Sequence, residues 1–277
     1  MIEMPNVPNE PEMNSFANDA TDERDQVSVI VPAYNNAATI EKALSSALSQ
    51  GELVKEVLVY DDCSNDSTPE LLAAFARANP RVKVIVGKHN RGAGVARRTL
   101  LHSASGRFIA FLDADDYWVA GKLKTQIEEM SRTGADVCTT DLRINDTSRR
   151  TVTNLRPKTV AGIRSFWWQN PIPMSTAVVR TSVVGWRDMP TLRARQDYAY
   201  WIKIFSANPE AKHVNVPEQL TMYRRTPDGL SGQAFRNLRN NYKMFREAIG
   251  FGRFLAGIRT IMNVVGKFRK ERSQRYE

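Results

Sequence analysis

Short runs of β-branched and apolar residues alternate with segments of helical period from residue 27 onward, and this rhythm limits the fold more than any other feature. Periods of two and 3.6 residues that alternate in this way predict βαβ units, in which helices cover both faces of a mostly parallel, doubly wound sheet. The expected strands span 27–33, 53–60, 82–87 and 107–113, and the helices between them span 39–50, 67–80 and 94–104.

The second half of the chain gives less regular signals. A helix is expected at 119–133 and a strand at 135–144, whereas the polar stretch 143–165 has little periodicity and is expected to be irregular. The stretch "ARQDYAYWIKIFSANP" predicts a further helix, and Asp197 lies at its polar start. We therefore expect an α/β protein with one large sheet.

Polar residues gather after each of the first four expected strands, in "PAYNN", "DDCSND", "KHNRGAG" and "DADD". Because ligands of open parallel sheets bind beyond the carboxyl ends of the strands, these loops should meet in one crevice. The carboxylates of Asp113, Asp115 and Asp116 repel one another and require a cation. A hard ion such as Mg²⁺ or Mn²⁺ binds carboxylates and completes its coordination shell with phosphate oxygens. Together with the basic loop that carries Arg91 and Arg97, the carboxylates therefore predict a diphosphate site. A cluster of Asp residues can also serve turns and caps alone.

Charge and cysteine content restrict the partners and the setting. The formal net charge of +9 favours an acidic partner, which could be nucleic acid, anionic lipid or a phosphorylated substrate. Cys63 and Cys138 match no zinc or disulfide spacing and fit a reducing, cytosolic setting. Residues 1–26 are polar, lack the pattern of a signal peptide and are expected to form a disordered leader. No stretch approaches the roughly 20 apolar residues that cross a bilayer.

Four stretches together resemble the family 2 glycosyltransferases, which are inverting transferases with the GT-A fold. They are "VSVIVPAYNNAATIEKALSSALSQ", "VLVYDDCSNDST", "NRGAGVARRTLLHSASGRFIAFLDADDYW" and "RQDYAYWIKI". The resemblance implies a Rossmann-like GT-A domain over 27–232, with a nucleotide-binding half at 27–117 and an acceptor half at 118–232. Residues 233–277 would follow as a basic, amphipathic helical extension.

The resemblance also assigns roles to particular residues. Asp113 would face the nucleotide, Asp115 would hold a Mg²⁺ or Mn²⁺ ion that bridges the diphosphate, and Asp197 would be the general base. An acidic residue at a helix start can instead simply complement the helix dipole. Arg224 and Arg225, in a stretch similar to the family's C-terminal flap, would neutralise diphosphate charge or lie in a solvated basic turn. The nucleotide-binding residues implied are Pro32, Tyr34, Asn35, Asp61, Arg91, Arg97, Asp113, Ala114, Arg224 and Arg225, with Pro32, Tyr34, Asp61 and Arg91 around a nucleoside, usually uridine.

Three residues depart from the family pattern. Cys63 stands where the family often has Gly, Arg98 where it often has Asn, and Gln196 where it often has Glu. The first two are expected to be tolerated loop and helix changes. Gln196 removes a carboxylate beside the expected base, which bears on acceptor binding.

Trp167 and Trp168 are candidates for the acceptor site. They either pack against the sheet or form a platform on which a sugar stacks, because an aromatic face matches the apolar C–H face of a pyranose.

The segment 248–270 contains no acidic residue between Ala248 and Lys270, and its apolar residues recur at helical spacing. Such a basic amphipathic helix suits an anionic membrane surface. The alternative is a stripe docked on the protein's own core or on a second subunit.

These observations predict an inverting, metal-dependent glycosyltransferase that moves a sugar from a nucleotide diphosphate, most often UDP, to a saccharide or polyprenyl-linked acceptor. The resemblance and the basic helix together place it on the cytoplasmic face of a bacterial inner membrane, in surface polysaccharide synthesis. A nucleotidyltransferase and a catalytically silent nucleotide-sugar-binding protein are the alternatives. A nucleic-acid-binding protein would carry a dense basic stripe with exposed aromatic residues, so no nucleic acid partner is expected.

Overall fold

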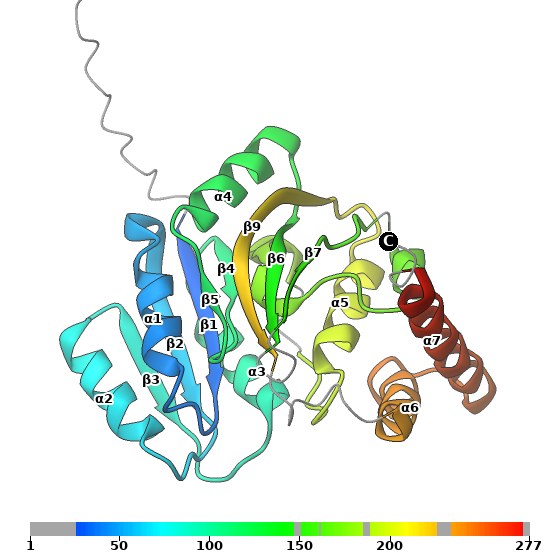
Figure 1. Cartoon of the computed structure of the whole chain (residues 1–277), viewed down its shortest axis with the longest axis horizontal. Coiled ribbons are helices and arrows are strands. Elements are labelled where there is room, and N and C mark those ends of the chain that lie inside the picture. The colour runs from blue at the N-terminus through cyan, green and yellow to red at the C-terminus, as the bar shows by residue number, and fades with distance from the viewer. Residues whose placement is uncertain (1–25, 147–150, 161, 185–188, 226–233, 274–277) are drawn as a thin grey trace, which may run out of the picture.

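The computed structural model describes residues 26–146, 151–160, 162–184, 189–225 and 234–273 (Figure 1). The strands are β1 (Val27–Ala33), β2 (Val54–Asp61), β3 (Val82–Val86), β4 (Phe108–Phe111), β5 (Tyr117–Trp118), β6 (Val137–Asp146), β7 (Thr151–Leu155), β8 (Val178–Arg180) and β9 (His213–Arg225). The α-helices are α1 (Ile40–Leu48), α2 (Thr68–Ala78), α3 (Ala93–Ser103), α4 (Lys122–Thr133), α5 (Gln196–Ala207), α6 (Ala234–Lys243) and α7 (Arg253–Ser273). Short 3₁₀ turns, η2 (Gly51–Leu53), η3 (Ile163–Phe166), η4 (Met174–Thr176) and η5 (Thr181–Val183), and a π turn, η7 (Met244–Ala248), join them.

All these strands belong to one curled sheet in the order β3-β2-β1-β4-β8-β6-β9-β5, with β7 paired to β6. The strands β1 to β4 are mutually parallel, as are β6 and β9, whereas β8 runs antiparallel to both β4 and β6. Since β8 separates them, β6 and β9 run in the same direction as β4. The carboxyl ends of both groups therefore share one edge, and the predicted mostly parallel α/β sheet is confirmed.

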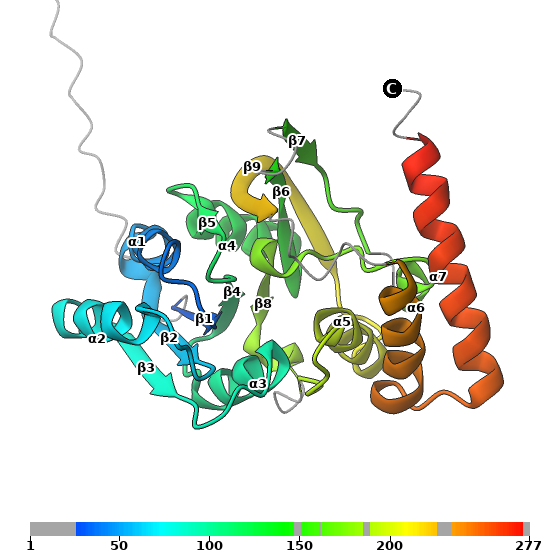
Figure 2. The same cartoon turned by 60° about the horizontal axis from the view of Figure 1, so that its bottom comes forward.

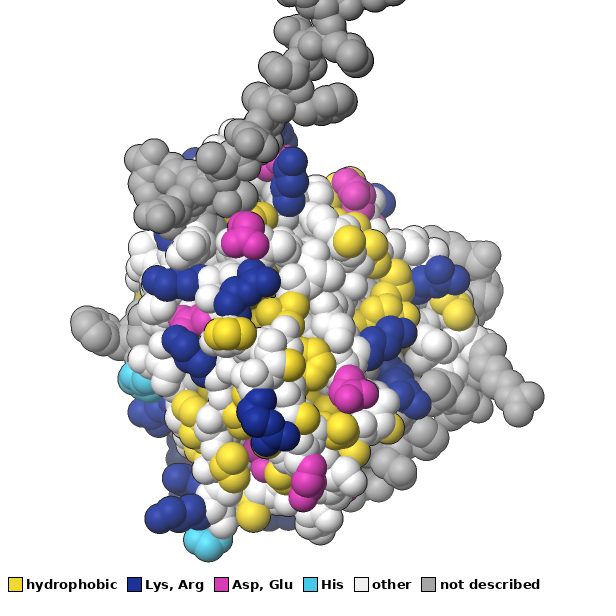
Figure 3. Space-filling view, turned by 90° about the vertical axis from the view of Figure 1, so that its left-hand side faces the viewer, with side chains coloured by type: hydrophobic (Ala, Val, Ile, Leu, Met, Phe, Trp, Pro, Cys, Tyr) yellow, Lys and Arg dark blue, Asp and Glu magenta, His cyan; other side chains and the backbone are white. Residues whose placement is uncertain are grey.

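Helices cover both faces of the sheet because its central strands are apolar on both sides. Every residue of β1 is buried, with Val27, Val29 and Val31 on one face and Ile30 on the other. The helices α1, α2 and α4 pack against the first face, and α3 and α5 pack against the second (Figure 2). On the outer surface around α1 and α2, charged side chains of both signs are interspersed with small groups of apolar ones (Figure 3).

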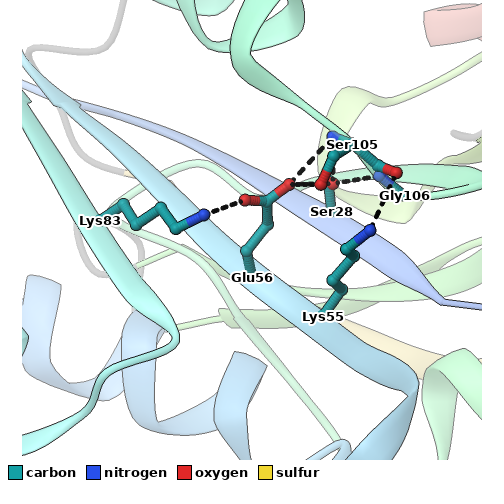
Figure 4. A network of polar contacts seen from close by, with 6 residues as sticks. All are labelled: Ser28, Lys55, Glu56, Lys83, Ser105 and Gly106. Atoms are coloured by element: carbon teal, nitrogen blue, oxygen red, sulfur yellow. Dashed lines mark hydrogen bonds and ion pairs between the residues drawn. The ribbon is translucent and has the colours of Figure 1, made fainter.

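A buried carboxylate ties the strands together at the edge opposite their carboxyl ends (Figure 4). Glu56 of β2 accepts hydrogen bonds from Ser28 of β1, from Ser105 and from Lys83 of β3. Burial by itself would raise the pKa of Glu56, but these bonds outweigh it and lower that pKa to about 2. At Gly106 a Cβ atom would lie 2.6 Å from the backbone nitrogen of Ser28, so the turn into β4 requires glycine.

The prediction that 143–165 is irregular was wrong in part. β6 continues to Asp146, and Thr151–Leu155 forms β7, which pairs with it from Leu142 onward. Most of β7 is solvent-exposed, so the strand shows no apolar period although its backbone is paired. The thirteen-residue strand β9 also went unpredicted.

The C-terminal helices pack on the α5 side of the sheet. Met244, Phe245 and Ala256 are buried in the same apolar cluster as α5. Asn263 of α7 donates a hydrogen bond at 2.8 Å to the hydroxyl of Tyr198 in α5. One side of α7 therefore packs on the protein's own core. The sequence had offered this packing as the alternative to a membrane contact.

The opposite side of α7 carries apolar side chains in contact with solvent. Phe254 is 84% exposed and Ile261 is 63% exposed. No helix within the described ranges combines the length and the apolar character that a membrane span requires. The expected leader, except Gln26, and residues 226–231 of the expected flap lie outside those ranges.

Candidate active site

Asp61, the last residue of β2, has one carboxylate oxygen engaged in its own loop and one without a partner. Its Oδ1 atom accepts hydrogen bonds from the backbone N–H and the hydroxyl of Ser64. Its Oδ2 atom is buried and accepts no hydrogen bond from any residue that the structure describes. Leaving a buried acceptor unpaired costs about 1–3 kcal/mol, so this oxygen is suited to a donor on a ligand.

The loops after β1 and β2 are joined by hydrogen bonds. Asn35 has a positive φ of 52°, its N–H donates to the hydroxyl of Ser64, and its side-chain oxygen accepts the N–H of Asn65. The Asn35 side chain therefore braces the loop beside Tyr34, a residue that is 44% exposed. Pro32 is buried inside β1, opposite Tyr60 of β2.

Cys63 is exposed and has a positive φ of 65°. This left-handed conformation is favourable for glycine and strained for residues with a Cβ atom. The structure thus gives a physical reason for the glycine that the family often has here.

Asp62 orders the loop between β3 and α3. Its carboxylate accepts the backbone N–H of Arg91 at 2.9 Å and that of Gly92 at 2.6 Å. Gly92 has a φ of 90°, which glycine tolerates. The second acidic residue of "DDCSND" therefore holds the loop that carries Arg91.

Asp116 is turned into the protein and joins three segments. It is 1% exposed, accepts a hydrogen bond from the hydroxyl of Ser175 at 2.5 Å, and accepts the backbone N–H of Arg224 at 3.1 Å. Burial and the neighbouring carboxylates of Asp113 and Asp115 raise the pKa of Asp116 well above its ordinary value. Its role is to anchor the acidic tip to the end of β9.

Asp113 and Asp115 are partly exposed at the carboxyl edge of the sheet, close to the side chains of Arg97 and Arg224. The guanidinium of Arg97 pairs with Asp113, while its Nε and Nη1 atoms are buried and unpaired among the described residues. Burial and the charge of Asp113 raise the pKa of Asp115 to about 6, against the opposing effects of Arg97 and Arg224. Ala114, between the two carboxylates, is buried.

A cation would relieve the repulsion between Asp113 and Asp115, and carboxylate oxygens are ligands that Mg²⁺ and Mn²⁺ prefer. Within the described ranges, no group of three or more His, Cys, Asp or Glu side chains could hold a metal ion. Asp113 and Asp115 can therefore hold an ion only if diphosphate and water oxygens complete its coordination shell. One or two carboxylates together with substrate phosphates are a common ligand set for Mg²⁺, so these residues are compatible with such an ion.

Asp197 lies in the first turn of α5, as its sequence position predicts, and α5 packs across the end of β4. The ring centroid of Phe111 lies 5.9 Å from those of both Tyr200 and Trp201. Arg195, the residue before the helix, has a positive φ of 64°. The Oδ2 atom of Asp197 accepts a hydrogen bond at 3.0 Å from the side-chain amide of Asn170.

The residues suggested for the acceptor differ in their exposure. Trp168 is 40% exposed, whereas the guanidinium of Arg259 from α7 lies 4.3 Å from the ring centroid of Trp167. Gln196 is 8% exposed, and its side-chain oxygen has no hydrogen-bond partner among the described residues. The side chain of Arg225 lies outside the described part of the structure.

Sequence reasoning missed Asn170 and Ser175, which contact Asp197 and the acidic tip. Their segment "NPIPMST" contains the Pro-X-Pro turn that the sequence does reveal. Nothing in the local pattern indicates which distant carboxylates its polar side chains reach.

The sheet order, with the acidic tip at the carboxyl edge of its parallel strands, is that of a GT-A domain. Residues 1–349 of Staphylococcus aureus TarS, solved with UDP-GlcNAc, match with a TM-score of 0.66 at 22% identity, over 88% of this chain and 73% of that one. The mannosyltransferase PcManGT of Pyrobaculum calidifontis, solved with GDP-Man and Mn²⁺, matches with a TM-score of 0.62 at 21% identity, over 88% and 74%. These likenesses establish the fold.

The chain belongs to glycosyl transferase family 2, because the model of that family matches residues 28–184. Bacillus subtilis TuaG, named for teichuronic acid biosynthesis, is 31% identical over 233 residues, which are 80% of this chain and 87% of TuaG. Escherichia coli WfgD, named as a UDP-Glc:α-D-GlcNAc-diphosphoundecaprenol β-1,3-glucosyltransferase, is 29% identical over 223 residues, 80% of this chain and 86% of WfgD. The protein is therefore a glycosyltransferase, as the sequence motifs predict.

Proposed function

We propose that the protein is an inverting glycosyltransferase that moves a sugar from a UDP-sugar to a hydroxyl of a lipid-linked saccharide during bacterial surface polysaccharide synthesis. The observation that carries this proposal is the placement of one carboxylate, Asp197, on the helix that packs against the end of the strand leading to the acidic tip. The names of TuaG and WfgD support the pathway and the class of acceptor.

The nucleoside would bind between the loops after β1 and β2. The unpaired Oδ2 atom of Asp61 would accept an N–H of the base, which for uracil is N3–H, and the exposed ring of Tyr34 would lie against it. Arg91, on the loop after β3 that Asp62 orders, would contact the nucleoside from a third direction. The nucleotide-binding half would be 27–117 and the acceptor half 118–232.

Asp115, with Asp113 beside it, would hold a Mg²⁺ or Mn²⁺ ion together with the diphosphate oxygens. Such an ion supplies positive charge that stabilises the departing diphosphate. The two unpaired nitrogens of Arg97 and the guanidinium of Arg224 would add to that charge from the protein.

Asp197 would accept the proton of the acceptor hydroxyl while the hydroxyl oxygen bonds to the anomeric carbon. The bond from that carbon to the diphosphate breaks in the same displacement, so the nucleoside diphosphate leaves with the electron pair. Attack from the opposite face inverts the configuration and needs no covalent sugar intermediate. Trp168, which is 40% exposed, would stack on the acceptor sugar, whereas the ring of Trp167 lies against the guanidinium of Arg259.

The exposed side of α7 would rest on an anionic membrane, and the enzyme would then lie on the cytoplasmic face of the inner membrane. Phe254 and Ile261 would enter the interface. Charge supports this, because ten basic residues and only two acidic ones lie between 234 and 273. The basic residues are Arg236, Arg239, Lys243, Arg246, Arg253, Arg259, Lys267, Arg269, Lys270 and Arg272.

The second candidate is a silent nucleotide-sugar-binding protein, favoured only by Gln196, which leaves an amide where the family often has a carboxylate. A nucleotidyltransferase is less favoured, because the loop after β1 has neither the glycines nor the basic residue expected of that class.

The test starts with thermal unfolding in the presence of Mn²⁺ and UDP-glucose, UDP-GlcNAc, UDP-galactose or GDP-mannose, since a donor that binds the folded protein raises the midpoint. Transfer is then measured to a synthetic α-GlcNAc-diphosphate lipid and to other diphosphate-linked sugars, and NMR assigns the anomeric configuration of the product. Asp197→Asn should reduce transfer by about 10²–10⁴-fold without weakening donor binding. Asp136→Asn, the same change at the opposite edge of the sheet, is the control. A product that retains the donor's configuration would falsify the mechanism.

A further inference from the structure

Asn170 holds its side-chain amide in one orientation. Its Oδ1 atom accepts the backbone N–H of Ile172 at 3.1 Å. Because a backbone N–H can only donate, this contact directs Nδ2 the other way, toward Oδ2 of Asp197 at 3.0 Å. The direction of the bond to Asp197 therefore follows from the local turn.

The turn that carries Asn170 has little conformational freedom. Pro171 and Pro173 fix their own φ angles and restrict the residues before them, including Asn170. Ile172 between them is fully buried. Asn170 is thus presented to Asp197 from a rigid support.

The other end of the same segment holds the acidic tip. The hydroxyl of Ser175 accepts the backbone N–H of Asp113 at 3.1 Å and donates to Asp116. The carbonyl of Ser175 accepts the indole N–H of Trp118 at 2.8 Å. One run of six residues therefore contacts the Asp197 carboxylate at one end, and the backbone of Asp113 and the buried carboxylate of Asp116 at the other.

The geometry points to Asn170 as a positioning residue for Asp197. Asn170 holds the Oδ2 atom of Asp197, so that Oδ1 is directed to the acceptor hydroxyl. Because the same segment ends at Ser175, which bonds the backbone of Asp113, it also fixes the distance between the base and the acidic tip. This inference rests on the proposed role of Asp197 as base. No other hydrogen bond to the Asp197 carboxylate is found among the residues that the structure describes.

Asn170→Asp keeps one contact of this side chain and reverses the other. The new carboxylate can still accept the N–H of Ile172, but toward Asp197 it presents a like charge in place of the N–H that Asp197 accepts. The matched control is Asn208→Asp at the other end of α5, where the amide donates to the carbonyls of Val183 and Ile204. Both variants lose an amide that donates to a residue of α5, so a general effect on the helix would appear in both.

Crystal structures of the two variants give a readout that needs no turnover. In Asn208→Asp the Asp197 carboxylate should keep its orientation, and in Asn170→Asp it should rotate away from the position that it has now. An unmoved Asp197 carboxylate in Asn170→Asp would overturn the inference, whatever the role of Asp197 is.

Kinetics with UDP-glucose, Mn²⁺ and the α-GlcNAc-diphosphate lipid test the consequence. Asn170→Asp should lower kcat by about 10–100-fold, the scale of a misplaced reacting group, while the KM for UDP-glucose stays within twofold. Asn208→Asp should keep the wild-type kcat even where its thermal midpoint falls. A normal kcat in Asn170→Asp would contradict the inference.

A double-mutant cycle separates positioning from a structural role. If Asn170 acts through Asp197, Asn170→Asp should cost little further activity once Asp197→Asn is present. Full additivity of the two changes would show that Asn170 acts elsewhere. If Asp197→Asn alone keeps full transfer, the proposed function fails, and the crystal structures still decide whether Asn170 orients Asp197.

Discussion

The guanidinium of Arg97 is paired with the carboxylate of Asp113 through one nitrogen only, and its other two nitrogens are buried without a partner among the described residues. Burying a charged donor without a hydrogen bond is unfavourable. The pair is therefore arranged for a third, anionic group. A diphosphate oxygen would satisfy the unpaired nitrogens and share the positive charge that Asp113 only partly neutralises.

Replacing Arg97 should weaken nucleotide binding. Hydrogen bonds to charged groups contribute about 1.5–3 kcal/mol each, so Arg97→Met should raise the Kd for UDP with Mn²⁺ at least tenfold. Isothermal titration calorimetry measures this directly. Arg98→Met, an exposed position on the same helix, is the control. Equal affinities in the two variants would mean that the unpaired nitrogens do not meet the diphosphate.

Asp115→Asn should remove the dependence of UDP binding on Mn²⁺. The amide keeps the shape of the side chain but lacks the negative charge that a hard cation requires. Titrations with and without EDTA should then give the same Kd in the variant and different Kd values in the wild type. Asp136→Asn should behave as the wild type, because it lies at the opposite edge of the sheet. A variant with undiminished Mn²⁺ dependence would exclude Asp115 as the ligand.

Acid should destabilise the protein through His213. Its Nδ1 atom accepts the backbone N–H of Val160, so the neutral ring carries its proton on Nε2, which faces Thr139. Burial lowers the pKa of His213 from 6.5 to about 4. Between these values the unfolded chain binds a proton that the folded protein does not. The free energy of unfolding should therefore fall as pH drops from 6.5 to about 4, by about 2–3 kcal/mol.

Urea unfolding at pH 7 and pH 4.5 tests the role of His213. In His213→Gln, the free energy of unfolding should differ much less between the two pH values than in the wild type. His102→Gln, at an exposed position in α3, should keep the wild-type difference. If the difference persists in His213→Gln, other groups cause the acid sensitivity.

Membrane binding should depend on the exposed side of α7. Burying an apolar side chain of this size is worth about 1.5–3 kcal/mol, so Phe254→Asp and Ile261→Asp should each weaken binding to phosphatidylglycerol vesicles at least tenfold. Cosedimentation measures this. Point changes are preferable to removing α7, because Ala256 on its other side is part of the core. Val152→Asp, an equally drastic change at a 52% exposed position in β7, should have no effect. If the wild type does not bind vesicles, the apolar side of α7 serves a protein contact.

Cys63→Gly should stabilise the folded protein. The left-handed conformation costs a residue with a Cβ atom about 1–2 kcal/mol. Glycine avoids this strain but loses more conformational entropy on folding, which cancels part of the gain. A gain of about 0.5–1 kcal/mol in the free energy of unfolding is therefore expected. Cys63→Ala keeps the strain and should show no such gain, while Cys63→Val should lose stability because a β-branched side chain fits this conformation worse. A more stable Cys63→Ala would point to the thiol rather than to the backbone.

The secondary structure over residues 27–113 could be predicted from the sequence in detail. The four strands and three helices over 27–113 were all found, because each has its own period and its own turn residues. Prediction was poorer beyond residue 143, where β7 lacks an apolar period. That strand is held by backbone pairing with β6, and because most of its side chains are exposed, the pairing leaves no mark on side-chain spacing.

The sequence by itself determined the four parallel strands over 27–113, the acidic tip at the end of the fourth strand and the position of Asp197 at the start of a helix, because strand period, turn chemistry and helix polarity are local along the chain. Only the tertiary structure decided how the three carboxylates of the tip differ: Asp116 is buried against Ser175 and Arg224, whereas Asp113 and Asp115 remain partly exposed. It also decided that Asn170 reaches Asp197 across 27 residues of chain and that α7 docks on α5 by one side. Burial and hydrogen-bond partners depend on which distant segments pack together, and that information is absent from any single stretch of sequence.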